Sequence, residues 1–291
     1  MRKTVFLCGL ALAVTVVSII ACVNTIGEQI DEQTERLDGG EGKEITFQIA
    51  QLEQTRVDTR AEMSIGLLCS NITLALYQGN TRVIKIDQDT DDSKFGTLST
   101  HLPYGNYTLV CLAHSSEGNA TTTNLEKISF PSSYVTDTFL YCEDIEVTEE
   151  TASVKDIALK RVVTKFEIEM TDKIPDNATM LEIKYTGGSA TLNALTGRGV
   201  TNSRQHEEFE VVPGTSPNTF EVYSFLFDEE GKLKYTITAY DNQDEEIFSR
   251  VFEGVSMKRN NITHFKGNFF GKGMEGTITA DSTWTHTNYD F

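Results

Sequence analysis

Apolar and polar residues alternate along most of the chain, and a period of two is typical of β-strands that bury one face. The first clear example is Ile45, Phe47 and Ile49, which predicts a strand over residues 44–52 with these three side chains pointing inward. Only residues 190–195 favour a turn or two of helix. Further strands are expected at 72–77, 83–86, 102–110, 134–142, 152–159, 162–170, 180–185, 209–212, 219–227, 233–240, 247–251, 262–270 and 276–280. In the segment 102–110, Pro103 and Gly105 are expected to shape a turn that leads into the strand.

The expected strands are short and are separated by turns rich in Gly, Asn and Asp, as in β-sandwich proteins. The pattern is interrupted near residue 160. We therefore expect an all-β protein with two tandem sandwich domains, residues 44–159 and 160–291. Residues 276–280 fit the last strand of the second domain, and the tail after Asp281 fits either that sheet or a neighbouring molecule.

The N-terminus carries the parts of an export signal, with basic Arg2 and Lys3, an apolar run and the small residue Ala21. Cys22 follows directly, as in a bacterial lipoprotein signal, where the thiol receives the lipid. We expect cleavage between Ala21 and Cys22, loss of residues 1–21, and acylation of Cys22, for example with palmitate. The alternatives are a plain secreted protein and an uncleaved helix, for which the run is at the short limit. Residues 22–43 are polar and fit a flexible tether.

The net charge of −18 is strongly acidic. Such a surface repels phosphate backbones and anionic lipids, so we expect no nucleic-acid partner and no attachment through a basic patch. Membrane attachment would depend on the lipid.

After Cys22 the chain has three cysteines, Cys69, Cys111 and Cys142, which lie in apolar, strand-like segments. Free cysteine in such a place behaves as a small buried apolar residue. An exported protein also permits a disulfide, and the sequence does not choose the partners. We favour buried thiols, with one disulfide as the alternative.

The chain contains no recognisable catalytic or cofactor motif. Its five histidines lack metal-binding spacing, and no phosphate loop or nucleophile elbow is present. We therefore expect a protein that is not an enzyme and needs no cofactor. Asp87, Asp89 and Asp91 place oxygens at alternate positions, as a calcium loop does, but Asp92 and Leu98 stand where such a loop needs Gly and Glu. A charged hairpin turn is the preferred interpretation, and no metal is expected.

Several segments occur together with the lipoprotein signal: LPYGNY at 102–107, RVVTKFEI at 161–168, LNALTG at 192–197 and KRNNITHFKGNFF at 258–270. In this order they resemble the fimbrillin superfamily of Bacteroidetes type V fimbriae, and within it the FimB-like fimbrial anchor lipoproteins. The resemblance covers most of the chain after the signal. It implies two transthyretin-like sandwiches and a place in fimbriae at the outer membrane.

The resemblance also implies that subunits join by strand exchange, in which an arginine-specific protease releases one subunit's first strand and a neighbour's strand replaces it. Here the first strand would be 44–52, and Arg56 and Arg60 follow it. Cleavage there would produce a stalk subunit, whereas an uncut chain would keep its lipid and act as an anchor. Ordinary loop arginines are the alternative interpretation.

A fimbrial anchor or accessory subunit is thus the first hypothesis, and a stalk or tip fimbrillin is its variant. The second hypothesis is a surface lipoprotein that binds glycans or host proteins. Glycan sites usually present exposed aromatic rings, and the chain has a single tryptophan, Trp284.

Overall fold

The computed structural model describes residues 40–52, 55–56, 65–271 and 276–280. These residues form an all-β fold, in which the only helical elements are two 3-10 turns, η1 (Ile65–Leu67) and η2 (Pro131–Ser133). The helix expected at 190–195 is wrong. Strand β12 (Thr191–Asn193) occupies this place, because its backbone pairs with β7 (Ile128–Ser129) and β13 (Arg198–Gly199).

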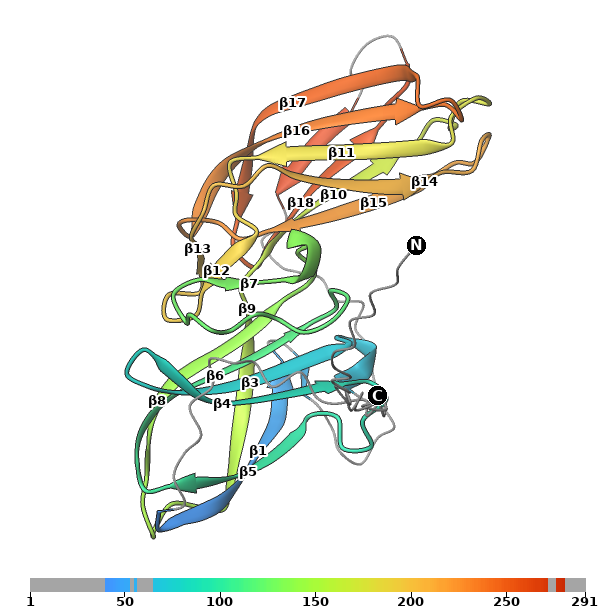
Figure 1. Ribbon diagram of the computed structural model, residues 1–291. Helices are drawn as coiled ribbons and strands as arrows, with labels where there is room; N and C mark the ends of the chain where they lie inside the picture. Colours follow the sequence, from blue (N-terminus) through green and yellow to red (C-terminus); the bar gives the residue numbers. More distant parts are fainter. Residues whose placement is uncertain (1–39, 53–54, 57–64, 272–275, 281–291) are drawn as a thin grey trace, which may run out of the picture. The chain divides into compact units, whose positions relative to one another are not determined.

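The first half of the chain forms one eight-stranded sheet in the order β2-β1-β9-β8-β6-β3-β4, with β5 paired to β1 (Figure 1). Strand β9 connects the two parts of this sheet. Its residues 154–159 pair in parallel with β1, and only its residues 160–161 pair with β8. The strand bounds are β1 Gly42–Leu52, β2 Thr55–Arg56, β3 Asn71–Gln78, β4 Thr81–Asp89, β5 Thr97–Pro103, β6 Gly105–His114, β8 Phe139–Val147 and β9 Val154–Arg161.

The two arms of this sheet enclose a first apolar core. Side chains from β1, β5 and β9 meet side chains from β3, β6 and β8 in it, including Phe47, Leu98 and Ile157 from the one arm and Leu74 and Leu109 from the other. All five are no more than 1 % exposed. The first half is therefore a β-sandwich built by a single folded sheet.

The second half forms two four-stranded sheets, β15-β10-β18-β19 and β14-β11-β16-β17. A second core lies between them, with Phe166 and Phe265 from the first sheet and Ile183, Tyr235 and Phe252 from the other. The strand bounds are β10 Thr164–Met170, β11 Met180–Thr186, β14 Gln205–Glu210, β15 Asn218–Ser224, β16 Glu230–Tyr240, β17 Glu246–Lys258, β18 Ile262–Gly267 and β19 Gly276–Ala280.

Both halves use the same strand order. In each, the first strand (β1 or β10) is antiparallel to the fourth principal strand (β5 or β15) and parallel to the seventh (β9 or β18). The facing sheets, β4-β3-β6-β8 and β14-β11-β16-β17, also correspond strand by strand. The chain thus contains an internal structural repeat that its sequence does not display.

A third core joins residues of the two halves. It contains Tyr77 and Leu112 from β3 and β6, Ile128 from β7, and Leu192 and Phe225 from the second half. Strands β3 and β6 are consequently buried on both faces, which explains why their sequences are almost continuously apolar.

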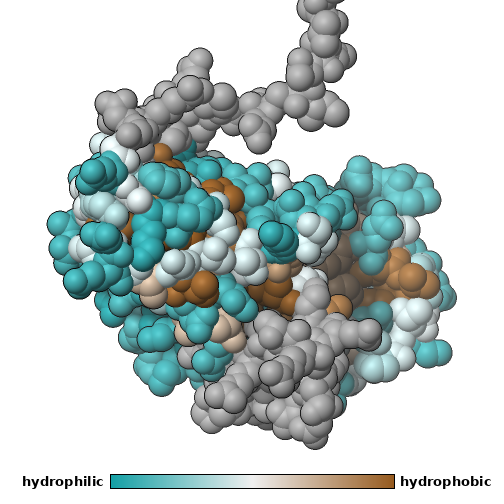
Figure 2. All heavy atoms as spheres, turned by 90° about the horizontal axis from the view of Figure 1, so that it is seen from below, coloured by the Kyte–Doolittle hydropathy of each residue, from teal (hydrophilic) through white to brown (hydrophobic). Residues whose placement is uncertain are grey.

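The surface seen from below is mainly hydrophilic, with separate apolar patches (Figure 2). Among the described residues, no helix has the length and apolar character needed to cross a membrane.

Candidate functional site: the first strand and its neighbours

Strand β1 is held on both sides by other strands. On one side residues 42–48 pair with β5, and on the other residues 46–52 pair with β9. Backbone hydrogen bonds fix the register, with Thr46 N donating to Ser153 O at 2.8 Å and Ile49 N donating to Gly96 O at 2.9 Å. The first strand is therefore an interior strand of its sheet.

The inward side chains of β1 are those predicted from the alternation. Ile45, Phe47 and Ile49 are 1 %, 0 % and 3 % exposed, and Leu52 joins them in the first core. Among the described residues, β5 has no strand partner other than β1. Removing β1 would therefore open the core and detach β5 from the sheet.

The predicted cleavage positions lie just beyond this strand. Arg56 ends the short strand β2, where it is the Cα partner of Gln51 of β1. Arg60 lies outside the described residues, as do Ala21 and Cys22 at the predicted lipid site.

The expectation for residues 276–280 is confirmed. They form β19, which pairs antiparallel with β18 from Thr263↔Ala280 to Gly267↔Gly276. The tail after Ala280 lies outside the described residues.

The aspartates considered as calcium ligands form hydrogen bonds and an ion pair within their own hairpin. Asp87 accepts a hydrogen bond from the Thr73 hydroxyl at 2.6 Å and pairs with Lys85 at 2.9 Å. Asp89 accepts a hydrogen bond from the backbone N–H of Asp91, and Asp92 accepts one from that of Asp89. Within the described part of the chain, no three His, Cys, Asp or Glu residues are grouped to hold a metal ion.

Cys69, Cys111 and Cys142 are free thiols, as preferred from the sequence, although Cys142 is only partly buried. Burial raises the pKa of Cys69 to about 12 and that of Cys142 to about 11, and it raises the pKa of Cys111 further. A thiol with a raised pKa is a poor nucleophile. Cys69 and Cys111 pack in the first core, and Cys142 packs against the third.

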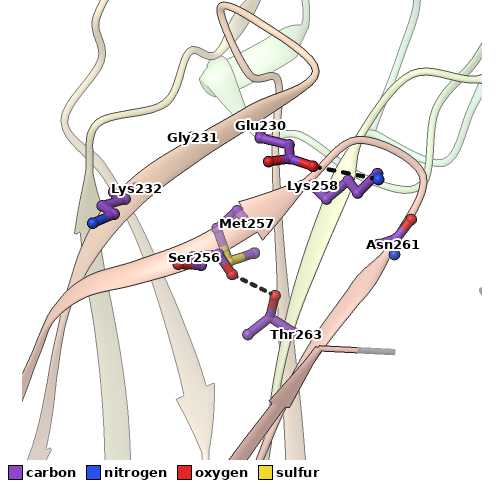
Figure 3. A pocket seen from close by; sticks show the side chains of 8 residues that line it. All are labelled: Glu230, Gly231, Lys232, Ser256, Met257, Lys258, Asn261 and Thr263. Carbon is purple, nitrogen blue, oxygen red and sulfur yellow. Dashed lines mark hydrogen bonds and ion pairs between the residues drawn. The ribbon is translucent and has the colours of Figure 1, made fainter. Parts of the chain in front are cut away.

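A pocket of about 410 Å³ lies in the second half, between the start of β16, the end of β17 and the start of β18 (Figure 3). Its polar groups already interact with one another: Lys258 pairs with Glu230 at 3.3 Å, and the Thr263 hydroxyl donates to the Ser256 carbonyl at 3.0 Å. These four groups are therefore engaged with one another at the pocket wall.

A buried polar network, which the sequence did not reveal, surrounds Glu207 of β14. The Tyr185 hydroxyl lies 2.7 Å from Glu207 Oε1 and 3.0 Å from the Tyr223 carbonyl, and the amide of Gln205 donates to it at 3.2 Å. The Tyr185 hydroxyl donates to Glu207 Oε1, and the Tyr223 carbonyl lies within hydrogen-bond distance of the same hydroxyl.

Burial raises the pKa of Glu207 to about 7, and the nearby Glu221 carboxylate contributes in the same direction. Tyr134, which precedes β8, also hydrogen-bonds Glu207. The sequence shows Glu207 only as one of many acidic residues. Its burial follows from its place opposite Ile183 of β11.

The fold and this site define an all-β protein whose most distinctive element is an interior first strand. The chain belongs to the family of unknown function DUF6562, whose model matches residues 41–290. No curated protein matches it.

Solved structures with a similar fold include a candidate adhesin from Bacteroides ovatus, with 16 % identity, a TM-score of 0.50, and coverage of 75 % of this chain and 86 % of that one. The fimbrial anchor protein Mfa2 from Porphyromonas gingivalis has 9 % sequence identity and a TM-score of 0.42. The match covers 82 % of this chain and 95 % of that one. A fimbrial assembly protein from Parabacteroides distasonis has 13 % sequence identity and a TM-score of 0.40. The match covers 83 % of this chain and 99 % of that one. At 16 % identity the likeness to the candidate adhesin is one of fold.

Proposed function

We propose that this chain is a structural, non-enzymatic lipoprotein of fimbriae. It would serve as an anchor or accessory subunit, held at the outer membrane by a lipid on Cys22 and joined to other subunits by β-strand complementation. Its two halves, residues 44–159 and 160–291, would be transthyretin-like domains. The shared strand order of the two halves supports this division, and the fold in common with a candidate adhesin is compatible with the role.

The observation that carries the proposal is the position of β1 between β5 and β9. In the sequence this strand follows the predicted lipoprotein signal and tether. A chain that keeps β1 has a filled sandwich and keeps its lipid. It offers no groove in the place of β1, so it would end, at the membrane, a polymer that grows by replacement of that strand. A chain that lost β1 would lose the lipid with it.

The intact mass of the mature protein tests this proposal. We expect a single acylated species that begins at Cys22, and radioactive fatty acid should label it. Cys22→Ala should abolish the label and release the protein from the membrane fraction. A lipid-free chain beginning at Val57 or Ala61 would instead identify a stalk subunit cut after Arg56 or Arg60. A mature chain without lipid and without such a cut would refute both.

A further inference from the structure

The two halves differ at one strand edge. In the second half, β18 has β10 on one side and β19 on the other. In the first half, β9 has β1 on one side, but β8 reaches only residues 160–161 on the other. Among the described residues, no strand pairs with the outer side of residues 154–159.

The register shows which backbone groups this edge presents. Ser153 O accepts a hydrogen bond from Thr46 N on the β1 side, whereas Val162 N donates to Thr138 O on the β8 side. Backbone groups of successive strand residues point to alternate sides. The N–H and C=O groups of Val154, Asp156 and Ala158 therefore face the open side.

A partly apolar surface lies on the inner face of β8, where Glu143 stands between Tyr141 and Ile145, and the ammonium of Lys155 of β9 lies 5.8 Å from the centroid of the Tyr141 ring. Phe139 and Val147 at the two ends of β8 are buried, but Tyr141 and Ile145 between them are only partly buried against the first core. Lys155 of β9 reaches across to Glu143 at 2.8 Å. This arrangement is expected where a sandwich lacks the strand that would cover the end of its facing sheet.

We propose that the outer edge of β9, with Tyr141 and Ile145, accepts one extended strand from a partner subunit, antiparallel to β9 and apolar at alternate positions. The orientation and the sequence pattern of this strand are inferred from β19. That strand pairs antiparallel with the corresponding edge of β18 and has the sequence Gly-Thr-Ile-Thr-Ala. The strand adds to the sheet while β1 stays in place, so an uncleaved chain also gains a binding edge. Only the identity of the partner rests on the proposed function.

The Lys155–Glu143 ion pair and the short length of the edge explain how it avoids unspecific pairing, since charges beside an edge strand oppose addition of foreign strands. The proposed site would therefore select a strand whose side chains can pack beside the Lys155–Glu143 ion pair.

Hydrogen exchange and NMR titration of the mature chain test the proposal, with an acetylated and amidated peptide of residues 275–281 as the probe. Without peptide, we expect the amides of Asp156 and Ala158 to exchange at least 100-fold faster than that of Ile157. Millimolar peptide should slow both at least 10-fold and shift the signals of Tyr141 and Ile145.

Matched variants separate edge pairing from other binding. Ala158→Pro removes one open N–H and should abolish the effect, whereas Ala158→Val keeps the N–H and should retain it. Ile145→Ser leaves β9 intact and should weaken binding at least fivefold, which provides a test if the proline variant does not fold.

Any of three results would overturn the proposal. The edge amides could already be protected before peptide is added, they could remain unprotected at millimolar peptide, or the proline variant could bind the peptide as well as wild type does. A finding that Cys22 carries no lipid would leave this result unaffected and would count only against the proposed anchoring.

Discussion

At the scale of single residues, the first strand is held mainly by apolar side chains. Phe47 is fully buried, and its neighbour Gln48 lies on the opposite face of β1. The two positions differ in burial but share the same backbone environment. Substituting each of the two residues therefore separates the contribution of side-chain packing to stability from that of strand pairing.

We expect Phe47→Ala to lower the free energy of unfolding by about 3–5 kcal/mol, because it leaves a cavity in the first core. Gln48→Ala should change it by no more than about 0.5 kcal/mol. Urea unfolding followed by fluorescence measures both. Equal effects of the two substitutions would mean that the side chain of Phe47 is not packed as described.

Glu207 makes stability depend on pH. Its pKa in the folded protein, about 7, lies above the ordinary value of 4.5, so the folded state holds the proton more tightly than the unfolded state. The resulting stabilisation is complete below about pH 4.5 and is lost as the pH rises through about 7.

Between pH 5 and 8, wild type should therefore lose about 1–3 kcal/mol relative to Glu207→Gln, which keeps the hydrogen bonds but does not ionise. Thermal unfolding of both chains across this range measures the difference. Parallel pH profiles would show that Glu207 ionises normally, and Glu208→Gln, on the exposed side of β14, is the control.

At the scale of elements, β1 is the strand on which the first sandwich depends. It contributes Ile45, Phe47, Ile49 and Leu52 to the core and connects β5 to the rest of the sheet. A strand with neighbours on both sides leaves a groove when it is removed, whereas an edge strand leaves only a shorter sheet.

A chain that begins at Val57 should accordingly fold poorly and melt at a lower temperature than the mature protein. A peptide of residues 42–52 should restore the melting temperature in a concentration-dependent way, because it binds only the folded state. The same peptide with Phe47→Asp should fail. If the shortened chain melts like the mature protein without peptide, β1 is dispensable and strand complementation has no basis here.

At the scale of the whole described chain, the third core joins the two halves, and Arg161 at the end of β9 also donates a hydrogen bond to Asn260 of the second half. Arg161, at the end of β9, pairs with Asp137 through two hydrogen bonds of 2.7 and 2.9 Å, and its guanidinium lies over the ring of Phe139. Its side chain is 1 % exposed, so water does not screen the pair strongly.

We expect Arg161→Ala to destabilise the protein by about 2–4 kcal/mol, since it leaves Asp137 without its partner and removes buried packing. Arg198→Ala, which breaks a solvent-exposed pair with Asp228, should cost less than about 1 kcal/mol. Chemical unfolding compares the two. An equal cost would show that the Arg161 pair is no stronger than a surface pair.

The sequence by itself determined the class of fold and the inward face of the first strand. Alternation of the kind seen at Ile45, Phe47 and Ile49 is local, and one buried face per strand follows directly from the pleat. The turn between residues 102 and 110 was also readable, since β5 ends at Pro103 and β6 begins at Gly105.

Only the tertiary structure decided which strands are neighbours. The parallel pairing of β1 with β9 joins residues about a hundred positions apart, and no local pattern encodes it. The strand at 191–193, the burial of Glu207 and the open edge of β9 likewise arise from contacts between distant segments. Periodicity specifies what a segment buries, whereas the packing of the whole chain selects the partner against which it is buried.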